Sequence, residues 1–540
     1  MFKNYFKTAW RNLMKYKLYS FLNIAGLTVG ILCSCLIFLY VTDELSYDNY
    51  SPLAERTYRI NFFGKLGERD VNSAQTQAPA GPLFKTEMPQ VEEMCRLRPN
   101  GRSIVKYENN SYNESNVLFA DSSLFRVFNF PLLQGNAGNA LTEPNTAVMS
   151  ATMSKKYFGN SDAIGRTIKL DNDKLYKITA VMNDIPANTH FKCEIFLSMS
   201  SLEDSREDNW GSTNFATYLV LKPGANIDQL SKTMTQSFIK HFGAILKQYL
   251  NTNWEEFTKN GNYAKLELFP LQKIHLYSQV EDELDVNGDI KYVYIFSIVG
   301  ILILTLACIN FINLTTARAS KRGKEVGIRK VAGATRSGLA KQFLGECFFI
   351  SILSWILALA LAWLLIPVFN QLSGKQFSSG DIFSVQFLPV SFLITVLTGL
   401  LAGLYPALFL SSFTPVKVLK GAKETSHSKS LLRNSLVIFQ FFITTVLLVS
   451  AFVVYQQLQY IRNKNLGFNK EQVLVINDAY LLNNNVQAFK QRLLQSPAVS
   501  DVSVTNSLAV SKDNNSTSII KGRNPSTENT VLINNIWTDA

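Results

Sequence analysis

Residues whose side chains could carry out catalysis or bind a metal are few and widely separated in this chain. His190 and His275 are isolated, and no H-E-x-x-H, C-x-x-C or G-x-S-x-G pattern occurs near either. The acidic cluster Glu281–Asp285 lacks the ligand spacing of a calcium-binding loop. We therefore predict no catalytic residue, no metal site and no cofactor. We interpret both histidines as structural or surface residues, and the acidic cluster as a solvated stalk.

The chain also lacks the pattern G-x-x-x-x-G-K-[ST], the loop in which backbone N–H groups and a lysine hold the phosphates of ATP. Because this loop is missing from the sequence, we expect that the chain does not itself hydrolyse ATP. If its function uses ATP, we expect a separate subunit to hydrolyse it.

Six cysteines are too sparse for a disulfide framework. Four of them fall in or beside strongly apolar windows, where a thiol behaves as a small apolar group: Cys33, Cys35, Cys308 and Cys347. Cys95 and Cys193 lie in the polar part of the chain and could pair in an oxidising compartment. Because the sequence contains no geometry for this pair, the Cys95–Cys193 disulfide stays open.

Five windows carry no charged residue and have a strongly apolar centre, so each could cross a ~30 Å hydrocarbon core as a helix of about 20 residues. The windows are Leu18–Thr42, Tyr292–Ala317, Cys347–Gly374, Ile382–Val416 and Asn434–Ile461. From them we predict membrane spans at 18–42, 291–317, 342–369, 388–411 and 435–457.

The basic residues gather between and before these spans. The net charge is +12, but residues 1–20, 315–341 and 412–434 carry +5, +7 and +4, so the rest of the chain is negative, at −4. Short loops rich in Lys and Arg stay on the cytoplasmic side and face anionic lipids. This pattern argues against nucleic acid as a partner. It predicts a multi-pass membrane protein with a cytoplasmic N-terminus and with membrane lipids as its neighbours.

The segments between the spans complete the predicted organisation. Residues 43–290 contain no span, and strand-like runs such as Tyr58–Phe62 and Leu175–Val181 alternate there with helical patterns. The predicted fold is an α-helical membrane protein with about five transmembrane helices plus a large α+β extracytoplasmic domain. The remaining segments are an interfacial amphipathic helix at 1–17, an outer loop at 370–387, a cytoplasmic linker at 412–434 and the start of a second exported domain at 458–540.

Two G-x-x-x-G pairs predict close packing between helices in the membrane. Gly26 and Gly30 lie in the first span, and Gly399 and Gly403 in the fourth. Small residues at this spacing let helices approach closely in lipid. Glycine is also common in membrane helices generally, so the pattern leaves that simpler explanation open.

The basic segment at 318–341 has the pattern of a short amphipathic helix along the membrane surface. Glu325 and Arg329 form an i,i+4 pair in the favourable order, Val326 and Lys330 share one row, and Gly333 stands near the expected C-terminus. Gly327 and Gly333 would leave low relief where another protein could approach. The alternative is a positive loop that only fixes the orientation of the spans.

The same residues carry a family resemblance. The run Glu325–Arg336 and the following Gln342–Glu346 resemble the cytoplasmic coupling segment of FtsX-like ABC transporter permeases. The resemblance implies a permease subunit whose coupling segment docks on a separate dimeric ABC ATPase. The docking residues it implies are Glu325, Val326, Gly327, Ile328, Arg329, Lys330, Gly333 and Ala334.

A second motif resembles the periplasmic core domain of macrolide-exporter-type permeases: Lys155–Gly159 followed by Ala163–Arg166. It implies that ATP hydrolysis drives a periplasmic conformational change that exports or extracts a substrate. A periplasmic or outer-membrane partner is left open. The alternative function is a signalling or scaffold membrane protein, as FtsX itself is, which passes ATPase-driven motion to a periplasmic hydrolase or sensor.

An internal repeat leads to one prediction. Leu432-Arg-Asn434 precedes the fifth span as Trp10-Arg-Asn12 precedes the first, at an offset of 422 residues. Relative to two complete repeats the second is truncated, so we expect the gene to continue by roughly 250 to 300 codons. Sequencing through the 3′ end tests this, and a stop codon directly after Ala540 would refute it.

The charge distribution also predicts the sidedness of the chain. A cysteine introduced at Ser161 should react with an impermeant thiol reagent in intact spheroplasts, and a cysteine introduced at Ser337 should react only after lysis. The opposite pattern of labelling would invert the topology.

Overall fold

The computed structural model describes residues 11, 14–67, 69–171, 174–317, 326–411, 427–465, 471–505, 516–520 and 530–534. The chain divides into two units. The membrane unit comprises Met1–Leu45 and Ile290–Glu471, and the second unit comprises Ser46–Asp289 and Gln472–Ala540. We call residues 46–289 the core domain. Most of the predicted helix at 1–17 lies outside the described residues.

The described part of the membrane unit contains five helices that are long and apolar enough to span a membrane. These are α2 (Lys17–Leu45), α9 (Ile290–Ala317), α11 (Arg336–Ser373), α13 (Phe387–Ser411) and α15 (His427–Asn463), with the short α12 (Ser379–Ile382) between α11 and α13. The predicted fold class is confirmed. Pro406 lies inside α13, which continues to Ser411.

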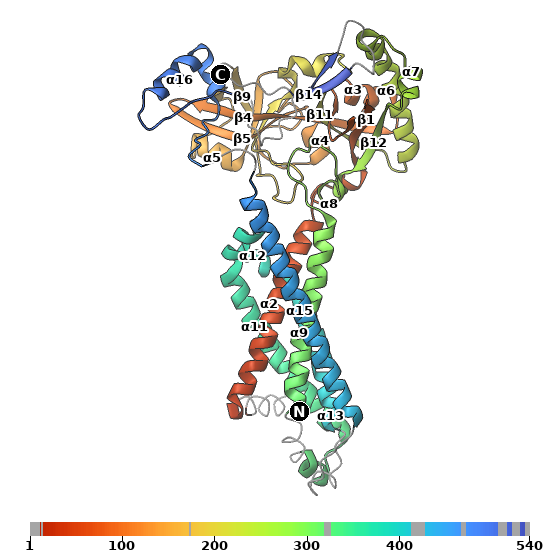
Figure 1. Cartoon of the computed structure of the whole chain (residues 1–540), viewed down its shortest axis with the longest axis vertical. Helices are drawn as coiled ribbons and strands as arrows, with labels where there is room; N and C mark the ends of the chain where they lie inside the picture. Colours follow the sequence, from red (N-terminus) through yellow and green to blue (C-terminus); the bar gives the residue numbers. More distant parts are fainter. Residues whose placement is uncertain are drawn as a thin grey trace. The chain divides into compact units, whose positions relative to one another are not determined.

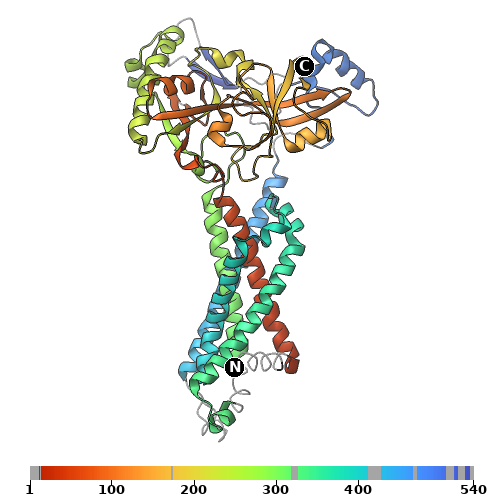
Figure 2. The same ribbon diagram turned by 180° about the vertical axis from the view of Figure 1, so that it is seen from behind.

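Polar side chains connect the helices of the membrane unit. The helices α2 and α9 lie side by side in both views (Figure 1, Figure 2), and the Ser34 hydroxyl donates to the Gly300 carbonyl at 3.1 Å. At the end of α2, the Lys375 ammonium lies 2.7 Å from the Asp43 carboxylate and 2.6 Å from that of Glu44. In lipid, where apolar surface drives little helix association, such contacts and close packing hold a bundle together.

The core domain is built on one mixed sheet of twelve strands in the described residues, ordered β12-β1-β11-β4-β5-β10-β7-β9-β6, with β2, β3 and β8 paired off this path. The pairs β5–β10 and β7–β9 are parallel. The strands are β1 (Thr57–Leu66), β2 (Arg69–Ser73), β3 (Thr76–Gln77), β4 (Val91–Tyr107), β5 (Asn110–Ala120), β6 (Leu132–Gln134), β7 (Thr146–Ser150), β8 (Thr167–Leu170), β9 (Lys174–Met182), β10 (Ile195–Ser198), β11 (Thr213–Leu221) and β12 (Tyr263–Pro270).

Helices and single turns connect these strands. They are η1 (Ala54–Arg56), α3 (Ala80–Glu87), α4 (Leu124–Phe128), α5 (Ala151–Phe158), η2 (Met199–Ser201), η3 (Glu203–Arg206), α6 (Ile227–Leu250), α7 (Trp254–Lys259), η4 (Leu271–Lys273) and α8 (Ile274–Tyr277). Beyond the fifth span lie η5 (Ala479–Asn485), α16 (Val486–Leu494) and the hairpin of β13 (Ser516–Ile520) and β14 (Thr530–Asn534).

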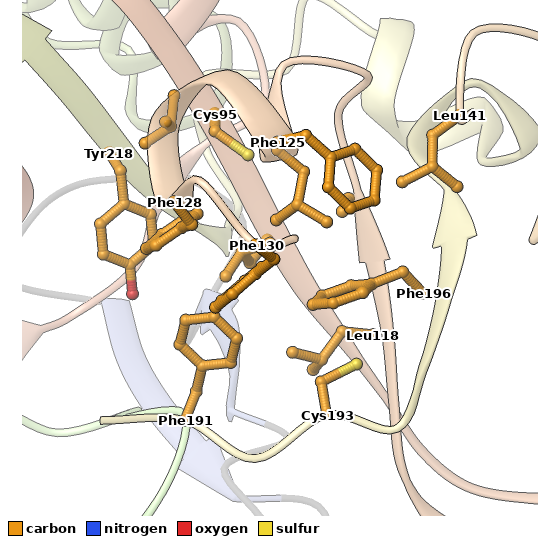
Figure 3. Close-up of a cluster of buried hydrophobic side chains, with 14 of the residues drawn as sticks. Cys95, Leu118, Phe125, Phe128, Phe130, Leu141, Phe191, Cys193, Phe196 and Tyr218 are labelled. Atoms are coloured by element: carbon orange, nitrogen blue, oxygen red, sulfur yellow. The ribbon is translucent and has the colours of Figure 1, made fainter. Parts of the chain in front are cut away.

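Aromatic rings fill one of the hydrophobic clusters of the core domain (Figure 3). Phe128 stacks on Phe130 with ring centroids 5.7 Å apart, and meets Phe191 and Tyr218 edge to face at 5.4 and 5.1 Å. Burying a side chain of this size stabilises a fold by about 1.5–3 kcal/mol, and paired rings add about 0.5–1.5 kcal/mol beyond their area. The cluster also includes Cys95 of β4, Phe196 of β10 and Tyr218 of β11.

The two cysteines that could have paired are free thiols in this cluster. Figure 3 shows them among the aromatic rings and apart from one another. The Cys193 thiol donates instead to the Ile195 carbonyl at 3.2 Å. Burial raises the pKa of both Cys95 and Cys193, which keeps them as thiols rather than reactive thiolates.

Free, buried thiols predict a specific pattern of reactivity. Denatured but unreduced protein should titrate all six cysteines, whereas in the folded protein Cys95 and Cys193 should react far more slowly than a cysteine introduced at the exposed Ser161. Mass spectrometry after timed alkylation measures both. Finding only four titratable cysteines in the denatured chain would mean that a disulfide exists.

Candidate coupling site and linker contacts

The described part of the predicted coupling segment is a short helix at 326–331 that ends in a tight turn. The N–H of Gly333 donates to the Lys330 carbonyl at 3.1 Å, and the N–H of Ala334 donates to the Arg329 carbonyl at 2.9 Å. This is the Schellman pattern, and Gly333 has the positive φ of 92° that it requires. Thr335 then caps α11 by accepting from the N–H of Gly338. The predicted helix over 318–341 is therefore interrupted, because residues from Arg336 onward belong to α11.

One side of this helix is attached to two membrane helices. Val326 is 1% exposed and packs with Leu339 and Phe343 of α11 and Ala407 of α13. The Lys330 ammonium donates to the Ser411 carbonyl at 2.7 Å, where the last carbonyls of α13 attract a cation.

Arg329 extends this attachment along α11. Its guanidinium donates to the Gln342 side-chain carbonyl at 2.8 Å. The segment is thus fixed to α11 and α13 by apolar packing and by two charged hydrogen bonds, so displacing it displaces the ends of both helices.

The other side of the helix is open. Ile328 is 62% exposed and Val331 is 69% exposed, although both are apolar. Gly333 is also exposed, but Gly327 is buried, so Gly327 does not offer the low relief that the sequence suggested. Ala334 is half-buried, and Glu325 lies outside the described residues.

The glycine pairs lie at close helix contacts within the membrane unit. A Cβ at Gly30 would stand 2.5 Å from the Ala307 Cβ of α9, and one at Gly26 would stand 3.1 Å from the Asn310 amide. A Cβ at Gly399 would meet the Ser351 hydroxyl at 2.8 Å, and one at Gly403 would meet the Cys347 Cβ at 2.8 Å. On these distances we propose that the four glycines set the spacing of α2 against α9 and of α13 against α11.

The structure also reveals contacts in the segment that follows α2, which we call the first linker (residues 46–49). The Asn188 amide donates to the Ser46 hydroxyl at 2.9 Å. Tyr47 stacks on His275 with ring centroids 3.4 Å apart. Each of the next two residues is bonded as well: Asp48 to His190, and Asn49 to Gln272 at 2.6 Å.

A buried chain of polar groups continues from Asp48. Its carboxylate lies 2.8 Å from Nδ1 of His190, and Nε2 of His190 lies 2.7 Å from the Tyr218 hydroxyl. All three side chains are buried. Burial raises the pKa of Tyr218, an effect that nearby Arg59 opposes, so the phenol keeps its proton. His190 and His275 therefore have a structural role, because each contacts a residue of the first linker.

The acidic cluster Glu281–Asp285 is not the solvated stalk that the sequence suggested. The buried Arg59 of β1 binds Glu283 through both guanidinium nitrogens, one of them at 2.8 Å, and donates to the Ser278 hydroxyl at 2.9 Å. The backbone of Glu281 pairs with the end of β2, since its carbonyl accepts from the N–H of Ala74 at 2.8 Å. We call residues 278–285 the second linker, which precedes α9.

The motif at 155–166 supports the core rather than forming a site. The Tyr157 hydroxyl donates to the buried Glu114 carboxylate at 2.6 Å, and the Lys156 ammonium lies 2.7 Å from it. The Arg166 guanidinium lies over the rings of Tyr107 and Phe158. Among the described residues, no group of three or more His, Cys, Asp or Glu is arranged to hold a metal ion.

Comparison with known proteins assigns two regions of this chain to known domain families. Residues 20–237 match the model of the MacB-like periplasmic core domain, and residues 297–415 match the model of the FtsX-like permease C-terminal domain. The chain belongs to the FtsX/MacB-type ABC permeases. It is a membrane protein with a periplasmic domain, as the two matched domains require.

Individual relatives are distant. The protein named "Probable export ATP-binding/permease protein MacB" of Pseudomonas entomophila is 19% identical over 432 residues, covering 78% of this chain and 59% of that protein. The macrolide export ATP-binding/permease protein MacB of Salmonella paratyphi A is 23% identical over 438 residues, covering 77% and 60%. The chain thus spans about three fifths of the length of these relatives.

One solved structure among those similar to this chain is the periplasmic region of MacB from Actinobacillus actinomycetemcomitans. It has 14% identity and a TM-score of 0.29, and the match covers 41% of this permease and 91% of that chain.

The glycine contacts predict an effect on the membrane bundle. Gly30→Leu should force α2 away from Ala307 and cost about 1–3 kcal/mol, as overpacking does in other cores. The matched control is Gly345→Leu in α11, where an added Cβ meets nothing within 4 Å. Thermal unfolding in detergent should show a lower midpoint for Gly30→Leu only. Equal midpoints for both variants would mean that Gly30 does not set the helix spacing.

Proposed function

We propose that this FtsX/MacB-type permease is the membrane subunit of an ABC transporter whose ATPase is a separate dimeric subunit. In this proposal the short helix at 326–331 docks on the ATPase in the cytoplasm. Hydrolysis of ATP then moves the spans and changes the conformation of the periplasmic core domain, which exports or extracts a substrate. The protein would be a multi-pass protein of the inner membrane with a cytoplasmic N-terminus, as the positive charge of its loops favours.

The observation that carries the proposal is the two-sided nature of the helix at 326–331. Its inner side is fixed to α11 and α13 through Val326 and Lys330, while its outer side exposes Ile328 and Val331. An apolar pair on a positively charged loop next to lipid fits a protein partner, because burying it against a partner would remove it from water. A loop that only fixed topology would need neither the attachment nor the exposed apolar side.

The domains named in the comparisons support the rest of the proposal. The two MacB relatives named above are called ATP-binding/permease proteins, and the one from Salmonella paratyphi A is called a macrolide export protein. The two family models match residues 20–237 and 297–415, which include most of the core domain and the candidate spans from α2 to α13.

Substitutions on the exposed side of the helix test the docking. The tagged permease is co-expressed with the ABC ATPase encoded nearest to its gene, and both ATPase recovery and stimulated ATP hydrolysis are measured. Val331→Asp should reduce recovery at least about tenfold, because an unpaired carboxylate in an interface costs about 1–3 kcal/mol or more. Gly333→Trp should do the same, since a bulky residue at positive φ disturbs the turn and obstructs approach. Arg329→Glu should weaken docking by breaking the bond to Gln342.

Val385→Asp is the matched control, since Val385 is also an exposed valine, at 89% against 69% for Val331, but lies between α12 and α13. It should leave recovery and ATP hydrolysis unchanged, and all variants should insert normally because the positive charge of the loop persists. If Val331→Asp, Gly333→Trp and Arg329→Glu all retained wild-type recovery and stimulated hydrolysis, the segment would only fix topology. The signalling or scaffold function would then be the better proposal.

A further inference from the structure

The core domain holds both linkers at neighbouring positions of one sheet. The second linker is bonded to Arg59 of β1, and the first linker is connected to Tyr218 of β11 through Asp48 and His190. In the antiparallel pairing of these strands, Arg59 and Tyr218 are directly opposite each other. Cross-strand partners lie on the same face about 4.5–5.5 Å apart. The first and second linkers are more than two hundred residues apart in the sequence, but both are attached to this one pair of side chains.

We propose that Arg59 and Tyr218 form an anchor pair that fixes both linkers to the core sheet and makes them move together. This inference rests on the proposed function, in which the core domain follows the motion of the spans. In the described residues, the first linker directly follows α2 and the second precedes α9. Arg59 and Tyr218 are positioning residues in this scheme, because they act on the linkers rather than on a substrate.

The chemistry of Arg59 suits a rigid attachment. Its guanidinium donates to the side chain of Asn61 on its own strand at 2.9 Å, and to Glu283 and Ser278 of the second linker. A guanidinium presents its donors in a planar fork, so these bonds fix both the position and the orientation of Glu283. Arg59 is fully buried. Removing one partner of a buried ion pair costs far more free energy than removing one partner of an exposed pair.

The attachment of the first linker is equally buried. Hydrogen bonds join the side chains of Asp48, His190 and Tyr218 in that order. The backbone N–H of Asp48 also donates to the Asn188 carbonyl at 2.9 Å. The linker therefore cannot rotate about Asp48 without breaking buried hydrogen bonds. Because β1 and β11 are hydrogen-bonded to each other, a displacement of either linker is carried into the same two strands.

Hydrogen exchange in the full-length, nucleotide-free protein tests whether the linkers are held together. Tyr218→Phe removes only the hydroxyl and should raise exchange at the Asp48 N–H by about tenfold, the loss of one buried hydrogen bond. Glu283→Gln removes the charge and should raise exchange at the N–H groups of Ala74 and Glu281. The anchor pair predicts a further effect: Glu283→Gln should also raise exchange at Asp48, and Tyr218→Phe should raise it at Glu281.

Two matched substitutions on β12 serve as controls. Tyr263→Phe and Glu267→Gln change exposed residues of the same types and should leave both linkers unaffected. Slow alkylation of Cys95 and Cys193 in every variant would show that the core stays folded. If Glu283→Gln unfolded the core, Ser278→Ala provides a milder change with the same expectation, because it keeps the ion pair and removes only the bond from Arg59 and the bond that the Ser278 hydroxyl donates to Glu283. Exchange confined to the linker that was altered would overturn the anchor pair.

A second measurement separates this inference from the proposed function. With the ATPase and ATP present, wild-type permease should show altered exchange in β1 and β11. Glu283→Gln should lose that response while ATP hydrolysis continues, since its cytoplasmic segment is intact. A response of wild-type size in Glu283→Gln would mean that the anchor pair does not transmit motion. No response in wild type would overturn the proposed function, and the nucleotide-free exchange would still decide whether the pair holds both linkers.

Discussion

The low polarity of the membrane interior is the constraint on which the rest of this structure depends. Charged side chains are expensive in hydrocarbon, so they collect at the ends of the five candidate spans. There they make the contacts that fix one helix to another: Lys330 at the last carbonyl of α13, and Lys375 at the two acids that end α2. Within the spans, the Ser34 hydroxyl of α2 donates to a carbonyl of α9, and Gly30 lies at a close contact between the same two helices.

The sequence predicted well those features that depend on local composition. Each of the five long uncharged windows coincides with a helix that is long and apolar enough to span a membrane. Gly333 was predictable near a helix end because few residues tolerate a positive φ. Val326 and Lys330 share a helical row, and both do face the membrane helices. The precise bounds were less predictable, since the turn after Lys330 divides one basic segment into two helices.

Sequence patterns could not predict contacts between residues that lie far apart in the chain. Arg59 stands out as an arginine in an apolar strand, but nothing local indicates that its partner is Glu283, 224 residues further along. The acidic cluster therefore looked like a solvated stalk. Asp48, His190 and Tyr218 come from three separate segments and share no spacing that a motif could describe. Gly327 was misjudged for a related reason, because burial against other helices depends on the tertiary fold.

The free thiols of Cys95 and Cys193 have a consequence for how this protein reaches its native state. Their protection comes from the aromatic cluster of the core domain, which exists only once β4, β10 and α4 have come together. The periplasm is a compartment in which exposed thiols are oxidised. If the core domain folded slowly, both thiols would stay exposed to oxidation for longer. A disulfide formed at that stage would be absent from the native structure, in which both cysteines are free and buried.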